Sequence, residues 1–237
     1  MMARSIAADL LKIRRKGLWF LVFLAPLGLT AMQALNFGLR YDYLTKVYAD
    51  DLWGGLIDNV ANFVPLALIM GATLLSSMIA NVEHMTGAWK QLLALPVSRA
   101  AVFAAKLAVV IGLLAVSCLL LSAATACLGI ILSFGEGMPV LALLKLGLYP
   151  LAAALPVVAL ECWVCVVYRN QALPVTMGLT LAIGSLAVAG YTKWIPLAWP
   201  VVAWRDPEGW KFAAAGAALA LVVYACGQLH FNRRDVA

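Results

Sequence analysis

Six long apolar stretches separate the few charged residues of this chain, and each is long enough to cross a lipid bilayer. They run approximately over Leu18–Phe37, Val60–Ala80, Ala101–Phe134, Val140–Tyr168, Pro174–Tyr191 and Phe212–Phe231. About 20 apolar residues in a helix span the hydrocarbon core, and a helix satisfies its own backbone hydrogen bonds in lipid. The sequence therefore predicts an all-α polytopic membrane protein with six transmembrane helices.

Composition supports this fold class. With 65% hydrophobic residues, 12% charged residues and a mean hydropathy of +0.95, the 237-residue chain has too little polar surface to cover a soluble globule. The apolar runs are continuous, whereas a membrane β-barrel would alternate apolar and polar residues. We expect one transmembrane domain over residues 1–237, because no internal repeat or second domain is visible.

Basic residues are divided unevenly between the two faces of the predicted membrane domain. Six spans place both termini on one face, which carries eleven of the 17 Lys and Arg residues: Arg4, Lys12, Arg14, Arg15, Lys16, Lys90, Arg99, Lys106, Arg169, Arg233 and Arg234. The other face carries Arg40, Lys46, Lys193, Arg205 and Lys211, and Lys145 lies in or near a span. The positive-inside rule therefore predicts a bacterial inner-membrane protein with cytoplasmic termini.

Three segments outside the spans have a distinct composition. Residues 1–17 are basic and predict a cytoplasmic interfacial helix before the first span. Residues 81–99 predict a cytoplasmic connector with an amphipathic helix, ended by Pro96, after which Ser98 would cap the next helix and Arg99 and Lys106 would lie near the lipid headgroups. Residues 192–210 combine tryptophans with prolines, which favours short external re-entrant or interfacial pieces.

The apolar face predicted for this connector helix consists of Val82, Met85, Trp89, Leu92 and Leu93, which recur at helical spacing. The opposite face carries polar residues, among them His84 and Lys90. An amphipathic helix on the cytoplasmic face could serve as a contact for a moving partner or simply as an interfacial anchor.

No enzymatic or nucleotide-binding motif stands out in the chain. A phosphate-binding loop is missing, and His84 and His230 lie far apart in the sequence. Cys162 and Cys165 have CxxC spacing, but they lie in an apolar span without further ligands, so we expect them to be structural and predict no metal site. The chain lacks a basic patch with interleaved aromatics and is not expected to bind nucleic acid.

Polar residues within the spans are candidates for a transport path or for an interface between helices. They include Asn62, Thr73 and Ser76 in the second span and Glu161 in the fourth. A carboxylate in hydrocarbon is unfavourable unless it is paired, hydrated or protonated. Glu161 is therefore expected either to meet Lys106 or Arg169 near the headgroups or to have a functional role.

The connector resembles that of a known family. Glu83, Gly87, Lys90, Leu93, Pro96, Val97, Ser98 and Arg99 match the pattern of type 2 ABC exporter permeases, known as the ABC-2 family. The chain length, the six spans and the basic N-terminal segment are also similar to that family. The small permeases of lantibiotic-immunity and bacitracin-resistance transporters resemble the chain most closely in size and layout.

The resemblance implies a mechanism. In such exporters the connector between the second and third spans is a coupling helix that docks on an ABC ATPase, and two permease copies, identical or related, face each other. Carried over to this chain, the residues that couple to the ATPase would be Glu83, His84, Gly87, Trp89, Lys90, Leu92 and Leu93, with Pro96, Ser98 and Arg99 forming the connector turn. ATP and Mg²⁺ would be bound by the dimeric ATPase, and this chain would bind no cofactor.

The sequence thus predicts the permease subunit of an ATP-driven exporter, with an antimicrobial peptide or another amphipathic compound as its substrate and immunity or resistance as its role. Two alternatives stay open. The chain could be a membrane anchor or sensory subunit that does not transport. It could also be an intramembrane enzyme, for which only Glu161, Cys162 and Cys165 offer reactive groups.

Overall fold

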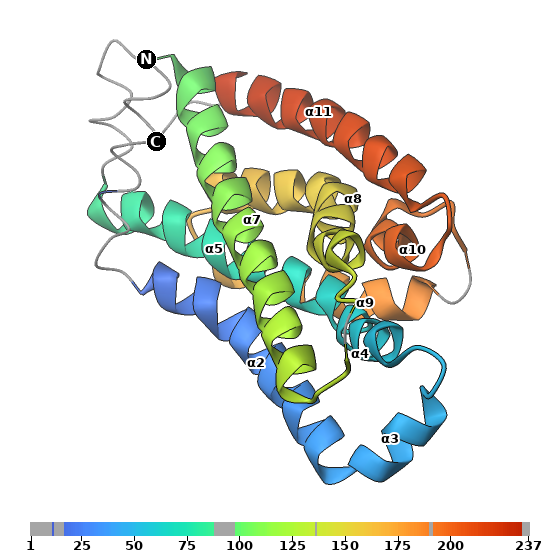
Figure 1. The fold of residues 1–237 in the computed structure, drawn as a ribbon. Coiled ribbons are helices and arrows are strands. Elements are labelled where there is room, and N and C mark those ends of the chain that lie inside the picture. The colour runs from blue at the N-terminus through green and yellow to red at the C-terminus, as the bar shows by residue number, and fades with distance from the viewer. Residues whose placement is uncertain (1–10, 12–16, 88–97, 136, 190–191, 234–237) are drawn as a thin grey trace.

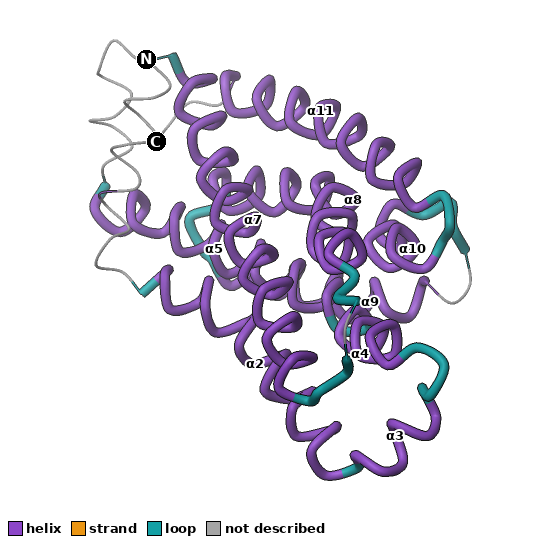
Figure 2. The backbone as a smooth tube through the Cα atoms, in the orientation of Figure 1, coloured by secondary structure: helices purple, strands orange, loops and turns teal. Residues whose placement is uncertain are grey.

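The computed structural model describes residues 11, 17–87, 98–135, 137–189 and 192–233. Within these residues the chain is helical throughout and forms no β-strand (Figure 2). The helices pack against one another as a bundle, with short connections between them (Figure 1). The predicted interfacial helix over residues 1–17 lies almost entirely outside the described residues.

Six longer helices form the bundle, and four shorter pieces join them among the described residues. The longer helices are α2 (Leu18–Leu39), α5 (Val64–Thr86), α7 (Arg99–Ile131), α8 (Val140–Val167), α9 (Ala172–Ala189) and α11 (Gly209–Arg233). The shorter pieces are α3 (Tyr41–Val47), α4 (Leu52–Ala61), the 3₁₀ turn η1 (Pro196–Ala198) and α10 (Trp199–Arg205). The short pieces between α9 and α11 occupy the segment for which the sequence predicted external elements; their position outside the bilayer stays a prediction.

Five segments are long and apolar enough to cross a membrane. They are α2, the nearly continuous pair α4 and α5 over Leu52–Thr86, α7, α8 and α11. The fifth predicted span corresponds to α9, an apolar helix that is shorter than these five. The helical membrane fold is therefore confirmed with five candidate spans in the described part of the chain, and the sixth crossing stays a prediction.

The predicted end of the second span needs correction, and the helix of the third span is unusually long. The second span was expected to end at Ala80, but α5 continues to Thr86, because no residue before Gly87 interrupts the helix. Helix α7, which contains most of the third predicted span, has 33 residues. At the usual rise, α7 is about 50 Å long, whereas the hydrocarbon core is about 30 Å thick.

Helix α8 lies at the centre of the bundle and contacts α5, α7, α10 and α11. Two prolines, Pro150 and Pro156, lie inside it. Such prolines are tolerated in membrane helices, where neighbouring helices and local adjustments satisfy the freed backbone groups. Packing against α11 is close: a Cβ added to Gly216 would stand 2.6 Å from the carbonyl oxygen of Ala152 on α8.

Candidate functional site

The connector between α5 and α7 begins at a sharply defined helix end. Gly87 adopts a left-handed conformation with φ 63°, and its N–H donates to the carbonyl oxygen of Glu83. A left-handed residue that closes the last turn is the usual way to end a helix, and glycine adopts it without a Cβ penalty. The chain therefore leaves α5 at Gly87 in a fixed direction.

The connector ends at an equally well-defined helix start. The Ser98 hydroxyl oxygen accepts a hydrogen bond from the backbone N–H of Ala101 at 3.2 Å, which makes Ser98 the N-cap of α7. This confirms the capping role predicted for Ser98. One residue further, an Arg99 guanidinium nitrogen donates to the carbonyl oxygen of Asn232 near the end of α11, at 3.3 Å.

A buried ion pair joins the two helices that flank the connector. The Nζ atom of Lys106 lies 2.6 Å from a carboxylate oxygen of Glu83, and each side chain is only 1% exposed. Lys106 was expected near the lipid headgroups, but its side chain is buried against Glu83, because the third turn of α7 packs against the end of α5. Glu83, which the sequence assigned to the contact with an ATPase, points into the bundle instead.

Other hydrogen bonds at this end of the bundle connect to α8. The ring nitrogen Nε2 of His84 lies 3.1 Å from the carbonyl oxygen of Cys165, near the end of α8. The indole N–H of Trp163 on α8 donates to Nδ1 of His230 on α11 at 3.0 Å. We call this region, where α5, α8 and α11 end and α7 begins, the connector end of the bundle.

The middle of the connector lies outside the described residues. It contains the predicted coupling residues Trp89, Lys90, Leu92 and Leu93 and the predicted helix stop Pro96. Their roles stay predictions. The structure does place their two attachment points, at Gly87 and Ser98, on a frame of helices held by polar contacts.

The polar residues predicted for the spans are not gathered into one site. Asn62 follows α4 at the opposite end of the bundle, where it is exposed and accepts a hydrogen bond from Arg205 at 2.7 Å. Thr73 is buried on α5, and its hydroxyl donates to the carbonyl oxygen of Ile69 in its own helix. Ser76 is buried one turn beyond Thr73 on α5, and its hydroxyl has no hydrogen-bond partner among the described residues.

Glu161 is completely buried on α8. Neither of its carboxyl oxygens has a hydrogen-bond partner in the described part of the chain, so the expected pairing with Lys106 or Arg169 is not formed. Cys162 and Cys165 beside it are also buried. Over the described residues, no group of three or more His, Cys, Asp or Glu side chains is placed to hold a metal ion.

A small apolar pocket opens between α2, α5 and α7. Its volume is about 40 Å³, and Leu21, Pro26, Leu68 and Leu121 are among the residues that line it. An engineered core cavity of about 150 Å³ can bind a benzene molecule, so a cavity of about 40 Å³ is small by comparison. This pocket is therefore no path for a larger substrate in the conformation described.

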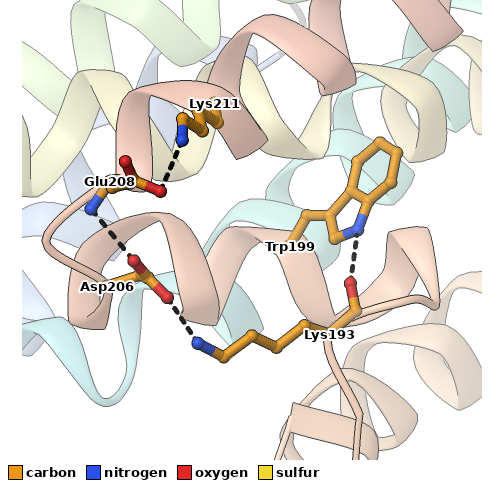
Figure 3. Close-up of polar contacts among 5 residues, drawn as sticks. All are labelled: Lys193, Trp199, Asp206, Glu208 and Lys211. Carbon is orange, nitrogen blue, oxygen red and sulfur yellow. Dashed lines mark hydrogen bonds and ion pairs between the residues drawn. The ribbon is translucent and has the colours of Figure 1, made fainter.

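The end of the bundle opposite the connector carries exposed ion pairs. Lys193 pairs with Asp206, and Lys211 pairs with Glu208, while the indole N–H of Trp199 donates to the carbonyl oxygen of Lys193 (Figure 3). Asp206 accepts a further hydrogen bond from the backbone N–H of Glu208. These contacts fix the short segment that leads from α9 through α10 into α11.

Sequence reasoning missed the pairing of Glu83 with Lys106, although a signal for it was present. Both are lone charges close to the ends of apolar helices, they have opposite sign, and only a short connector separates the helices. A lone charge on an apolar membrane helix needs a partner. The pairing could therefore have been predicted from charge and topology, whereas the isolation of Glu161 could not.

The fold and these contacts define a class, that of multi-pass helical membrane proteins. A family model narrows it: the model described as ABC-2 family transporter protein matches residues 5–185, which is more than half of the chain. The chain therefore belongs to the ABC-2 family of transporters. No curated protein and no solved structure matches it. Membership indicates a membrane permease subunit that works with an ATPase partner, and the matched region includes the whole connector.

Proposed function

We propose that this chain is the permease subunit of an ATP-driven exporter, and that the connector between α5 and α7 transmits conformational change from the ATPase. The observation that carries the proposal is the frame around the connector, within the region matched by the ABC-2 family model. Gly87 and Ser98 fix the two attachment points, and the Glu83–Lys106 ion pair joins the two helices. A connector attached to such a frame can move the two helices that flank it, whereas a loosely attached connector would only bend.

The connector end is proposed to face the cytoplasm of a bacterial inner membrane. The unequal distribution of Lys and Arg between the loops supports this orientation. It would place both termini and the connector on the side where ATP is available. The exposed segment of Figure 3 would then face the outside.

The transport path is proposed to form between two permease copies, identical or related. The pocket between α2, α5 and α7 has a volume of about 40 Å³ and is too small for a peptide or a lipid-like compound. Outward-facing surfaces of α2 and α11 are apolar and exposed in a single chain, with Phe20, Leu24 and Leu221 among their side chains. These surfaces are available for lipid or for a second copy.

The substrate is proposed to be an amphipathic compound, such as an antimicrobial peptide removed from the membrane for immunity or resistance. Two observations support this class over a small ion: apolar lateral surfaces dominate the bundle, and charged side chains in its interior are few. A compound that partitions into lipid can reach such surfaces from the bilayer.

ATP hydrolysis by the full-length permease with its ATPase in nanodiscs tests the proposal. Trp89→Ala, combined with Leu92→Ala, is expected to abolish the stimulation of hydrolysis by the permease while the two subunits remain associated. Trp194→Ala is the matched control, because Trp194 is 91% exposed and belongs to the segment between α9 and α11. It should leave the stimulation unchanged.

Failure of the two subunits to associate, or equal stimulation by all variants, would overturn the proposal. The first outcome would favour a membrane anchor or sensory subunit. The second would show that the connector does not couple the subunits.

A further inference from the structure

Glu83 occupies a position from which it can hold two helices together. Its backbone carbonyl accepts the hydrogen bond from Gly87 that ends α5, and its carboxylate pairs with Lys106 of α7. One residue thus fixes both the last turn of α5 and the distance from α5 to α7.

The ion pair lies close to both attachment points of the connector. At the usual helical rise, Glu83 is about 6 Å along α5 from Gly87, and Lys106 is about 12 Å along α7 from Ser98. The ion pair therefore joins α5 to α7 close to the two residues, Gly87 and Ser98, at which the connector is attached. A displacement of the connector would be applied to both helices.

Burial makes the connection between Glu83 and Lys106 stiff. Both side chains are 1% exposed, so water contributes little to the solvation of either charge. Two charges withdrawn from water are stabilised by each other and by the polar groups around them, and separating them is strongly unfavourable. The ion pair therefore resists any movement that would separate the end of α5 from the start of α7.

We propose that Glu83 and Lys106 are positioning residues that make the end of α5 and the start of α7 move as one body when the connector is displaced. This inference rests on the proposed function, since it explains how a displacement of the connector by the ATPase reaches two spans. It replaces the expectation that Glu83 contacts the ATPase directly. The contacts of His84 with Cys165 and of Arg99 with Asn232 extend the same body to α8 and α11.

The test uses the full-length permease with its ATPase in nanodiscs and three paired variants. Glu83→Gln with Lys106→Met removes both charges without leaving either one buried alone. Glu83→Lys with Lys106→Glu restores the attraction with opposite polarity. Glu208→Gln with Lys211→Met is the matched control, because it removes an exposed ion pair far from the connector.

Stimulated ATP hydrolysis is expected to fall about fivefold or more in the variant with the neutral pair. A change of about fivefold is at the lower end of the range typical for energetic coupling between two sites. It should recover in the swapped pair and stay unchanged in the control. A purely structural role would be revealed by loss of assembly, so the elution profile and the unfolding temperature of each variant are measured alongside.

A distance measurement tests the connection between α5 and α7 in the absence of the ATPase. Spin labels at positions 85 and 100, near the ends of α5 and α7, are introduced after replacement of the five native cysteines. The distance distribution in the permease alone should be narrow with the native pair, broad with the neutral pair and narrow again with the swapped pair.

The outcomes separate this inference from the proposed function. A wild-type permease that does not stimulate its ATPase would overturn the proposed function. The label distances would still decide whether the ion pair holds α5 and α7 together. Stimulation and label distances that are unchanged in the neutral pair would overturn the inference alone. Failure of the swapped pair to recover would also count against the ion pair as the cause.

Discussion

Gly178 of α9 lies so close to Thr73 of α5 that a Cβ added to Gly178 would stand 2.0 Å from the Thr73 hydroxyl oxygen. Thr73 is buried, and its hydroxyl bonds within its own helix. The absence of a side chain at Gly178 permits this close approach, and the contact defines how α9 packs on α5.

Gly178→Ala is expected to destabilise the protein by about 1–3 kcal/mol, because the added methyl overlaps a packed side chain. Thermal unfolding in detergent measures the effect. Thr73→Ser combined with Gly178→Ala removes a second overlapping atom, the Thr73 methyl, and should recover part of the loss. Gly112→Ala is the control, because a Cβ there would meet no atom within 4 Å; equal effects at the two glycines would contradict the packing shown.

The two buried glutamates are expected to respond in opposite ways to the same substitution. Glu161→Met replaces a carboxyl group without hydrogen-bond partners by an apolar side chain of similar length, which should raise the free energy of unfolding by about 1–3 kcal/mol. Glu83→Met leaves the Lys106 ammonium buried without its carboxylate, which should lower the free energy of unfolding by about 3–5 kcal/mol.

Chemical denaturation of the two variants, compared with wild type, checks this contrast. A stability loss in Glu161→Met would show that Glu161 has a partner that the fold described here does not supply, such as a second copy of the chain. A stability gain accompanied by loss of stimulated ATP hydrolysis would assign Glu161 to function, since functional sites are often kept at a cost in stability.

Much of the fold followed from hydropathy, because in a membrane the length and polarity of a segment decide whether it can cross. The α7 and α8 regions illustrate this, and the Ser98 cap could be recognised from its own side chain. The extent of α5 was not predicted, because a helix ends where its last turn is closed, and that depended on the conformation of Gly87.

Side-chain partners could be predicted less well than spans. Lys106 was expected near the headgroups, and Glu161 was expected either to meet a cation or to have a functional role. The burial of a charge depends on which neighbouring helix meets it. Sequence spacing gives the position of a residue on its own helix, whereas the partner belongs to another helix. The pairing of Glu83 with Lys106 and the isolation of Glu161 are therefore properties of the packed bundle.

Ser98→Ala is expected to loosen the first turn of α7 at a cost of about 1 kcal/mol, because the N-cap hydrogen bond to the Ala101 N–H is lost. Hydrogen exchange of the backbone amides near the start of α7 measures the change and should show faster exchange there. Ser98→Asp preserves an oxygen acceptor and should retain the protection. Equal exchange in the wild type and Ser98→Ala would show that tertiary contacts alone hold this helix start.

The ion pair of Lys193 with Asp206 predicts a dependence of stability on pH. The Lys193 side chain, followed by the backbone N–H of Glu208, holds the pKa of the Asp206 carboxyl below its ordinary value of 3.8 (Figure 3). A carboxyl group with a lowered pKa in the folded state binds its proton more weakly there than in the unfolded state. Its contribution to stability is therefore complete above the ordinary pKa and is lost as the pH falls through the folded-state value.

Asp206→Asn removes that contribution while keeping the shape of the side chain. The unfolding temperature of the wild type should exceed that of Asp206→Asn at neutral pH, and the difference should shrink only in strongly acidic buffer. High salt should also reduce the difference, because Lys193 is exposed and its charge is screened. A difference that persists unchanged at a pH well below 3.8 would show that shape and hydrogen bonding, and not the charge of Asp206, hold the segment between α9 and α11.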